Sequence, residues 1–177
     1  MATIGIFFGT DSGTTRLLAK KMAKILGDDI ASKPLNINRT SVEDFLAYDA
    51  LILGTPTYGE GCLPGIATGV KDGSWQEFLP KLEGCDLSDK TIALYGLGNS
   101  EKYPDRFADA VFELHSALTA QGASFVGQCN PADYSFEQSQ AVVAGEFVGL
   151  VLDHVTQPLL TDTRIQNWLD VITPQLL

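Results

Sequence analysis

Cysteine and histidine are both scarce in this chain of 177 residues. The three cysteines, Cys62, Cys85 and Cys129, are odd in number and match no zinc or CxxC spacing, so we expect no disulfide framework. The only histidines are His115 and His154, which leaves little material for a metal site or a histidine-based triad. A GxSxG motif is also missing. These absences disfavour metalloenzymes and hydrolases.

Long apolar runs and a leader segment are missing too. No hydrophobic stretch approaches the roughly 20 residues that cross a bilayer. Residues 1–3 lead directly into a short apolar run, without the basic segment that opens a signal peptide. We therefore expect a cytoplasmic protein that does not enter the membrane. With 45% hydrophobic and 19% charged residues, the chain is predicted to form one domain over residues 1–177.

Positive charge is in short supply. Twelve Lys and Arg residues face 22 Asp and Glu residues, which gives a net charge of −10. Residues 1–40 hold six basic and three acidic side chains, whereas residues 41–177 hold six basic and nineteen acidic ones. Binding to nucleic acids or anionic membranes is thus disfavoured. Two interpretations of the acidity stay open: solubility, or a docking surface that attracts a basic partner over long range.

Apolar runs alternate with segments of helical periodicity, a pattern typical of an α/β fold with a parallel sheet. Strands are predicted at Thr3–Phe8, Pro34–Ile37, Ala50–Thr55, Lys90–Leu97 and Ser124–Gly127, the last continuing as Phe147–Leu152 after a polar excursion at Cys129–Glu146. One helix is predicted with Leu17, Leu18, Met22 and Ile25 on its inward face, and a short helix is predicted to follow a Ser41/Asp44 capping pair. Further helices are predicted at Ser74–Leu82, Asp105–Gln121 and Asp162–Ile172. The predicted architecture is a three-layer α-β-α domain with a doubly wound five-stranded parallel sheet.

In such sheets, ligands bind outside the carboxyl ends of the strands, where the strand order reverses. We therefore expect the loops after strands one, three and four to form one site. The first loop, Gly9–Thr15, joins a buried strand to a helix N-terminus and is rich in hydroxyl groups. It lacks both the Walker lysine and a GxGxxG pattern. It suits a single terminal phosphate monoester, although an ordinary Thr/Ser-rich helix cap is the plain alternative.

The other two loops each place a tyrosine among glycines. Tyr58 lies in Thr55–Gly61, and Tyr103 lies in Gly96–Pro104. Two tyrosines that face each other could hold a flat heterocycle between their rings. Taken alone, each is as easily a surface tyrosine.

Together, the loops resemble those of the long-chain flavodoxins. The matching runs keep their order along the chain: Ile6–Thr15, Gly54–Gly61, Tyr95–Gly98, Tyr103–Pro104, Phe147–Leu150 and Leu152–Asp153. The Cys129–Glu146 excursion is similar to the insertion that splits strand five in the long-chain branch. The Gly59–Gly65 stretch is similar to flavodoxins that serve nitrogen fixation.

The resemblance implies an α/β flavodoxin-like fold and a bound FMN. Carried over by position, the phosphate loop is Thr10, Asp11, Ser12, Gly13, Thr14 and Thr15, and the remaining cofactor-binding residues are Thr55, Pro56, Thr57, Tyr58, Gly59, Glu60, Leu97, Gly98, Asn99, Tyr103, Phe107 and Asp153. Tyr58 and Tyr103 would flank the isoalloxazine. The Gly59–Glu60 peptide would turn on reduction and stabilise a neutral semiquinone. Asp153 is a weaker candidate, because a capping role explains it as well.

Three residues depart from the family pattern. Asn99 stands where Asp is common and removes a negative charge beside the flavin. Arg106 stands where Asn is common, which weakens any transfer of a side-chain role. Asp11 places an acid in the phosphate loop, where it would have to face solvent.

The resemblance also implies a function. We expect an electron-transfer protein rather than an enzyme: a low-potential one-electron carrier, cycling between semiquinone and hydroquinone, whose second reduction is made harder by acids such as Glu60 and Asp105. Nitrogenase reductase is the candidate acceptor, and a ferredoxin/flavodoxin reductase or a pyruvate oxidoreductase is the candidate donor. We expect a monomer. The alternative is an FMN-dependent NAD(P)H:quinone-type oxidoreductase of the same fold. A signalling receiver would need an Asp at the end of strand three, where this chain has Gly54-Thr55.

Overall fold

A parallel sheet lies at the centre of the molecule, as the alternating pattern predicts. The computed structural model describes residues 2–10 and 13–177. Within them, the main sheet consists of β1 (Ile4–Phe8), β2 (Leu35–Asn36), β3 (Ala50–Thr55), β4 (Thr91–Leu97), β5 (Ser124–Val126) and β8 (Leu150–Leu152). The strand order is β2-β1-β3-β4-β5, with β8 also paired to β4 and every pairing parallel. The order reverses between β1 and β3, as in doubly wound folds.

The fifth strand is split into two segments. β5 pairs with Thr91–Ala93 in the first half of β4, and β8 pairs with Tyr95–Leu97 in the second half. Between them lies a separate antiparallel hairpin, β6 (Val142–Val143) and β7 (Glu146–Phe147). The predicted excursion is therefore confirmed, but the predicted strand Phe147–Leu152 begins too early. Phe147 exchanges backbone hydrogen bonds with Cys129, at 2.8 and 3.1 Å, so it cannot pair with β4.

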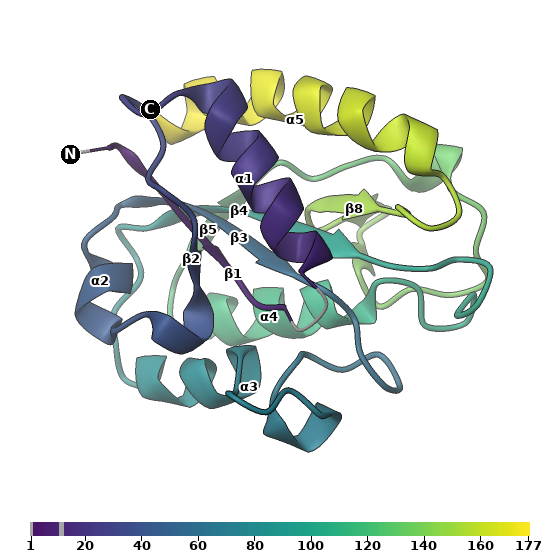
Figure 1. Cartoon of the computed structure of the whole chain (residues 1–177), viewed down its shortest axis with the longest axis horizontal. Helices are drawn as coiled ribbons and strands as arrows, with labels where there is room; N and C mark the ends of the chain where they lie inside the picture. The colour runs from purple at the N-terminus through teal and green to yellow at the C-terminus, as the bar shows by residue number, and fades with distance from the viewer. Residues whose placement is uncertain (1, 11–12) are drawn as a thin grey trace.

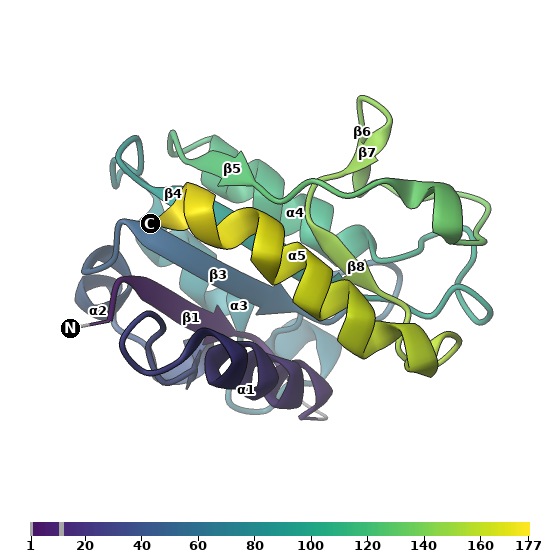
Figure 2. The ribbon, with the colours of Figure 1, turned by 90° about the horizontal axis from the view of Figure 1, so that it is seen from above.

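Helices cover both faces of the sheet (Figures 1 and 2). α1 (Thr14–Leu26) and α5 (Thr161–Leu176) lie on one face, while α3 (Trp75–Phe78) and α4 (Asp109–Thr119) lie on the other. α2 (Val42–Leu46) begins at the capping box that Ser41 and Asp44 were predicted to form. Side chains alternate along β1: Ile6 packs with α1 and α5, and Phe7 packs in the cluster under α3 and α4. Short 3-10 turns occupy Ile37–Arg39, Ile66–Thr68, Leu79–Leu82, Pro131–Asp133 and Pro158–Leu160.

The inner face of α1 differs from the predicted one. Thr15, Leu18, Ala19 and Met22 are buried at the i, i+3, i+4, i+7 spacing of one helix face. Leu17 and Ile25, predicted to point inward, are 66% and 41% exposed. The prediction from large apolar residues alone chose the wrong inner face of α1, because a buried threonine and a buried alanine belong to that face.

Helix ends differ from the sequence-based bounds where tertiary packing overrides periodicity. α4 starts at Asp109 rather than at Asp105, because the completely buried Phe107 ring stacks on Phe136 and Ala108 adopts a left-handed φ of 53°. α3 ends at Phe78, and the predicted helix continues as a 3-10 turn in which Pro80 lacks an N–H donor. α5 extends past Pro174 because Leu176 is buried against the core.

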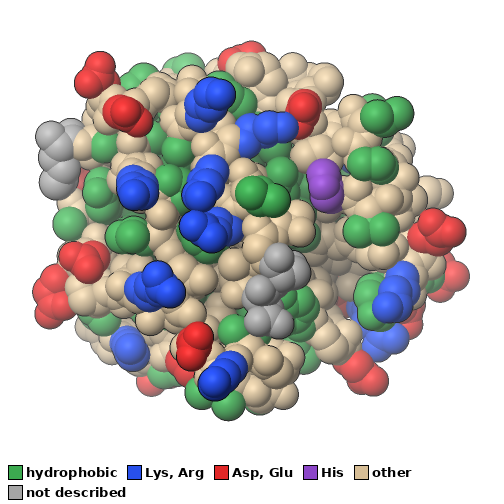
Figure 3. Space-filling view, in the orientation of Figure 1, with side chains coloured by type: hydrophobic (Ala, Val, Ile, Leu, Met, Phe, Trp, Pro, Cys, Tyr) green, Lys and Arg blue, Asp and Glu red, His purple; other side chains and the backbone are tan. Residues whose placement is uncertain are grey.

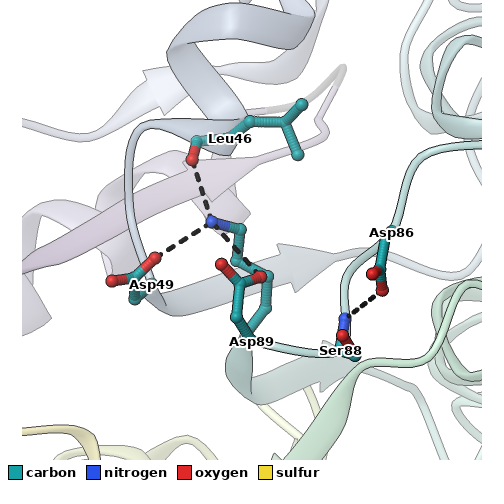
Figure 4. A network of polar contacts seen from close by, with 6 residues as sticks. Leu46, Asp49, Asp86, Ser88 and Asp89 are labelled. Atoms are coloured by element: carbon teal, nitrogen blue, oxygen red, sulfur yellow. Dashed lines mark hydrogen bonds and ion pairs between the residues drawn. The ribbon is translucent and has the colours of Figure 1, made fainter.

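A buried lysine lies at the amino end of the sheet, away from the predicted site (Figure 4). The Lys90 Nζ donates to the Leu46 carbonyl at 2.9 Å and to Asp49 Oδ1 at 3.1 Å, and it lies 3.8 Å from Asp89. The nearby backbone N–H of Ser88 donates to Asp86, which lowers the pKa of that carboxyl. The contact holds the start of β4 against the segment that leads into β3.

The described part of the chain contains neither a helix able to cross a membrane nor a cluster able to hold a metal ion. None of its helices combines the length and the apolar character that crossing a bilayer requires. No group of three or more His, Cys, Asp or Glu side chains in the same residues is arranged to hold a metal ion.

Candidate functional site

The loops after β1, β3 and β4 meet at one rim of the sheet. The Gly9 N–H donates to the Gly54 carbonyl at 2.9 Å and joins the first loop to the end of β3. A pocket of about 110 Å³ lies between the second and third loops. Its lining comprises Pro56, Thr57, Leu97, Gly98, Asn99, Tyr103, Arg106 and Ala108. The structure thus brings together six of the predicted site residues around one pocket.

The first loop offers hydroxyl groups at the start of α1. Asp11 and Ser12, which were predicted to belong to it, lie outside the described residues. Thr10 Oγ1 accepts the Gly13 N–H at 3.0 Å, and Gly13 turns the chain into the helix with a φ of 92°. Thr15 is completely buried, and its carbonyl is held by the Tyr95 hydroxyl at 2.9 Å. The loop is therefore fixed from below by β4.

Two buried hydroxyls beside this loop lack a partner among the described residues. They are Thr15 Oγ1 and Ser74 Oγ. A Cβ at Gly9 would lie 2.4 Å from Ser74 Oγ, so the glycine lets the loop pass directly over this hydroxyl. Buried polar atoms in native proteins normally have a partner, so these two groups fit an oxygen-rich ligand at this position. Sequence reasoning missed Ser74, which was noted only as the start of a helix and lies far from the loop in sequence.

The second loop closes on itself into a tight turn. Tyr58 and Cys62 exchange backbone hydrogen bonds of 2.9 and 2.7 Å. Gly59 has a φ of 53° with nothing within 4 Å of a Cβ built there, and Glu60 is 90% exposed at the tip. At the base of the turn, the Thr55 hydroxyl donates to the Pro56 carbonyl at 2.8 Å.

Thr57 joins the second loop to α4. Its Oγ1 accepts the Ala110 N–H, at 3.4 Å, in the first turn of the helix. α4 has no capping side chain of its own, because the preceding residue is Ala108. The threonine of the second loop therefore caps the helix from outside.

The third loop is anchored by Asp153 at the end of β8. The buried Asp153 carboxylate accepts the Ser100 N–H at 3.2 Å and the Ser100 hydroxyl at 2.5 Å. Asn99 Oδ1 accepts the Lys102 N–H at 3.0 Å and the Thr156 hydroxyl at 3.3 Å. Asp153 does not line the pocket, so its contribution is to position the loop that does.

Arg106 is a pocket residue that the sequence noted only as a departure. Its guanidinium lies 5.6 Å from the centre of the Tyr103 ring, 3.9 Å from Glu60 and 3.6 Å from Asp105. It therefore connects the second and third loops and places a positive charge beside two carboxylates. Its position three residues after Tyr103 was the one signal that could have indicated this role.

Phe107 lies outside the pocket lining, although it was predicted to bind the cofactor. Its ring is 0% exposed and packs at 5.2 Å from Phe136 and 6.2 Å from Phe147. Both partners belong to the chain between β5 and β8, so Phe107 attaches this inserted segment to the floor of the third loop.

Asp109 is a buried acid at the start of α4 that the sequence did not single out. Burial raises its pKa, and the Gln140 N–H, which donates to Oδ1 at 2.9 Å, opposes that rise. Asp105 adds to the rise and Arg106 counteracts it. An acid among the inward-facing positions of an otherwise apolar helix face was the available signal.

Comparisons with known proteins identify the family and agree with the fold. The flavodoxin family model matches residues 6–168. A flavodoxin of Klebsiella pneumoniae is 48% identical over 97% of each chain, and flavodoxin 1 of Escherichia coli is 39% identical over 99% of this chain and 96% of its own. The crystal structure of Fusobacterium nucleatum flavodoxin bound to flavin mononucleotide is 32% identical, covers 99% of both chains and superposes with a TM-score of 0.87. These matches confirm the fold predicted from the sequence, and the chain belongs to the flavodoxin family.

Proposed function

We propose that this chain binds FMN without a covalent bond and carries single electrons at low potential between larger redox proteins. The observation that carries the proposal is the pair of buried, unpartnered hydroxyls of Thr15 and Ser74 beside the first loop, at the rim where the pocket of the other two loops opens. The FMN-bound Fusobacterium relative, of the same fold, supports it.

Each loop has a proposed part in holding FMN within one domain formed by residues 1–177. The phosphate lies in the first loop, against Thr10, Asp11, Ser12, Gly13, Thr14 and Thr15, and Ser74 adds a hydroxyl that the sequence did not suggest. The ring lies against residues 55–60 and 97–99, with Tyr58 and Tyr103 beside it. Asp153 and Phe107 hold the third loop in place from behind. A helix N-terminus with neutral donors suits the charge of a phosphate monoester.

When bound, FMN supplies one-electron transfer chemistry, and the protein sets how readily it accepts electrons. Glu60 and Asp105 disfavour added negative charge at the ring, while Arg106 between them offsets part of this effect. A unit charge about 10 Å away changes the energy of a charged ring by roughly 1.7 kcal/mol at an effective dielectric of about 20, before salt screening. Two acids against one arginine leave a net negative field and favour a low potential.

The partners and the setting are also proposals. We propose nitrogenase reductase as the acceptor, on the resemblance of Gly59–Gly65 to nitrogen-fixation flavodoxins, and a ferredoxin/flavodoxin reductase or a pyruvate oxidoreductase as the donor. The protein would act as a cytoplasmic monomer. The acids of residues 41–177 supply a surface for a basic donor.

FMN titration tests the cofactor proposal. The Thr15→Val variant keeps the shape of the side chain but loses the hydroxyl, so FMN affinity should fall by about tenfold or more. Thr163→Val, on the exposed side of α5, is the matched control and should bind like the parent. A parent protein that stays colourless in excess FMN, or a Thr15→Val variant with unchanged affinity, contradicts the proposal.

Electron-transfer assays separate the carrier from the quinone-reducing alternative. With NAD(P)H and a quinone but no added reductase, the FMN-loaded protein should turn over slowly or not at all. Rapid turnover would favour the enzyme. Oxidation of the reduced protein by nitrogenase reductase, followed by its absorption spectrum, tests the acceptor separately.

A further inference from the structure

A broad groove beside α1 carries a local charge opposite to that of the whole protein. It has a volume of about 950 Å³ and lies between α1 and the segment that leads into β2. Arg16, Lys20, Lys24 and Lys33 line it, with Asp28 as the only acid. Figure 3 shows Lys and Arg side chains gathered over this face. The groove therefore carries a local excess of positive charge on a chain whose net charge is −10.

Three of these cations form a regular row along one helix. Arg16, Lys20 and Lys24 follow each other at i, i+4 and i+8 on α1, which contains no acidic residue. All three are exposed, and within the described chain neither their side chains nor that of Lys33 makes an ion pair or a side-chain hydrogen bond. By contrast, Lys21 on the same helix is paired with Asp162 of α5.

The shape of the groove favours an extended ligand over a small one. Its four cations are exposed, and no buried charged side chain reaches into it to hold a single small anion. Successive cations of the row are about 6 Å apart along the helix axis. Alternate side chains of an extended peptide are about 6.4–6.8 Å apart, which nearly matches that spacing. The lining also offers apolar surface, from Ala23, Pro34 and Tyr48.

We propose that this groove, from Arg16 to Lys33, is a second docking surface that binds an extended segment of a partner protein with acidic residues at alternate positions. Long polyanions such as nucleic acids fit less well, because residues 41–177 carry six basic and nineteen acidic side chains that repel them. A short acidic segment feels mainly the local row of charges, since the Debye length is about 10 Å at 0.1 M salt. The lining of the groove shares no residue with that of the pocket between the second and third loops.

Peptide binding to the FMN-loaded protein tests this proposal. The probe is a short peptide of alternating Glu and Leu, labelled with a far-red dye and followed by fluorescence anisotropy. The Lys20→Glu/Lys24→Glu variant should bind it at least about tenfold more weakly than the parent. Lys71→Glu/Lys81→Glu makes the same change in net charge at exposed sites elsewhere and should bind within about twofold of the parent. The absorption spectrum of bound FMN confirms that both variants are folded.

Four outcomes overturn the proposal. Equal weakening by the two double variants would mean that only net charge matters. If a peptide with Gln in place of Glu bound equally well, the row of cations on α1 would have no role in binding. Tighter binding to phosphatidylserine vesicles than to the peptide, lost in Lys20→Glu/Lys24→Glu, would identify a membrane instead. Self-association of the parent in sedimentation, abolished by the same variant, would identify a second copy.

Discussion

Gly59 is the residue whose backbone sets the flavin-side turn of the second loop. Its φ of 53° lies in the left-handed region, where a β-branched side chain is strained. Gly59→Val should therefore hinder the turning of the Gly59–Glu60 peptide and lower the potential of the first of the two flavin reductions. Potentiometric titration measures this. Gly59→Asn, which tolerates a positive φ, should shift the potential less, and an unchanged first potential in the valine variant contradicts the idea.

Asn99 allows a change of charge with little change of contacts. Its Oδ1 accepts hydrogen bonds from Lys102 and Thr156, and an aspartate oxygen can accept both. Asn99→Asp therefore adds one negative charge at the pocket and should lower the potential of the second reduction, by the equivalent of roughly 1–2 kcal/mol. Redox titration at low and high salt checks both the shift and its screening. A raised or constant potential would count against the electrostatic account.

The raised pKa of Asp109 predicts that the free energy of unfolding depends on pH. Burial raises its pKa above the unfolded value of about 3.9, so protonation favours the folded state. Its contribution is present below that unfolded pKa and is lost as the pH rises through the folded pKa. Asp109→Asn keeps an acceptor for Gln140 without a charge. The variant should gain stability relative to the parent between about pH 4 and pH 7. Urea titrations across that range measure the difference, which should disappear at the acid end.

At the scale of elements, α4 depends on the second loop for its cap. Thr57→Val removes the acceptor of the Ala110 N–H and should lower the free energy of unfolding by about 0.5–2 kcal/mol. Urea unfolding of the flavin-free protein measures this without interference from the ligand. Thr57→Ser retains the hydroxyl and should remain close to the parent. Equal losses in both variants would point to packing of the methyl group rather than to capping.

The sequence predicts most accurately the elements that are buried along their whole length. Ala50–Thr55 has the predicted bounds because all six residues are buried, and this continuous apolar run fits only a central parallel strand. The prediction fails at Phe107, which precedes α4 instead of lying within it, and at Phe147, which belongs to the β6–β7 hairpin instead of the main sheet; their rings pack together. Leu17 fails for a related reason, since periodicity alone does not say which stripe faces the sheet. Packing between distant segments decides such cases.

The loops that form the candidate site could be predicted from the sequence, but the contacts between those loops could not. Strand ends and glycines indicated the loops that supply Thr57, Gly98 and Tyr103 to the pocket. The contact of Arg106 with Glu60, the cap from Thr57 and the place of Ser74 below Gly9 join residues from different loops. No local pattern encodes such pairs, because each depends on how the sheet brings distant strand ends together.

At the scale of the molecule, charge distribution governs encounters. Residues 41–177 hold nineteen acidic side chains against six basic ones. Reduction by a basic reductase should therefore slow by severalfold or more as salt rises from about 10 to about 300 mM. Stopped-flow kinetics measures the rate, and an uncharged chemical reductant serves as the control. A rate independent of salt would leave solubility as the explanation of the acidity.

The divided fifth strand gives the two halves of β4 separate neighbours. β8 supports the half that leads into the third loop, and Asp153, which follows β8, holds Ser100 in that loop. β5 pairs with Thr91–Ala93, the half of β4 that is farther from the third loop. A transient opening of the three-residue β8 would thus loosen one wall of the pocket while the rest of the sheet remains closed. Amide exchange at this edge would then report the breathing of the site, on a faster timescale than global unfolding.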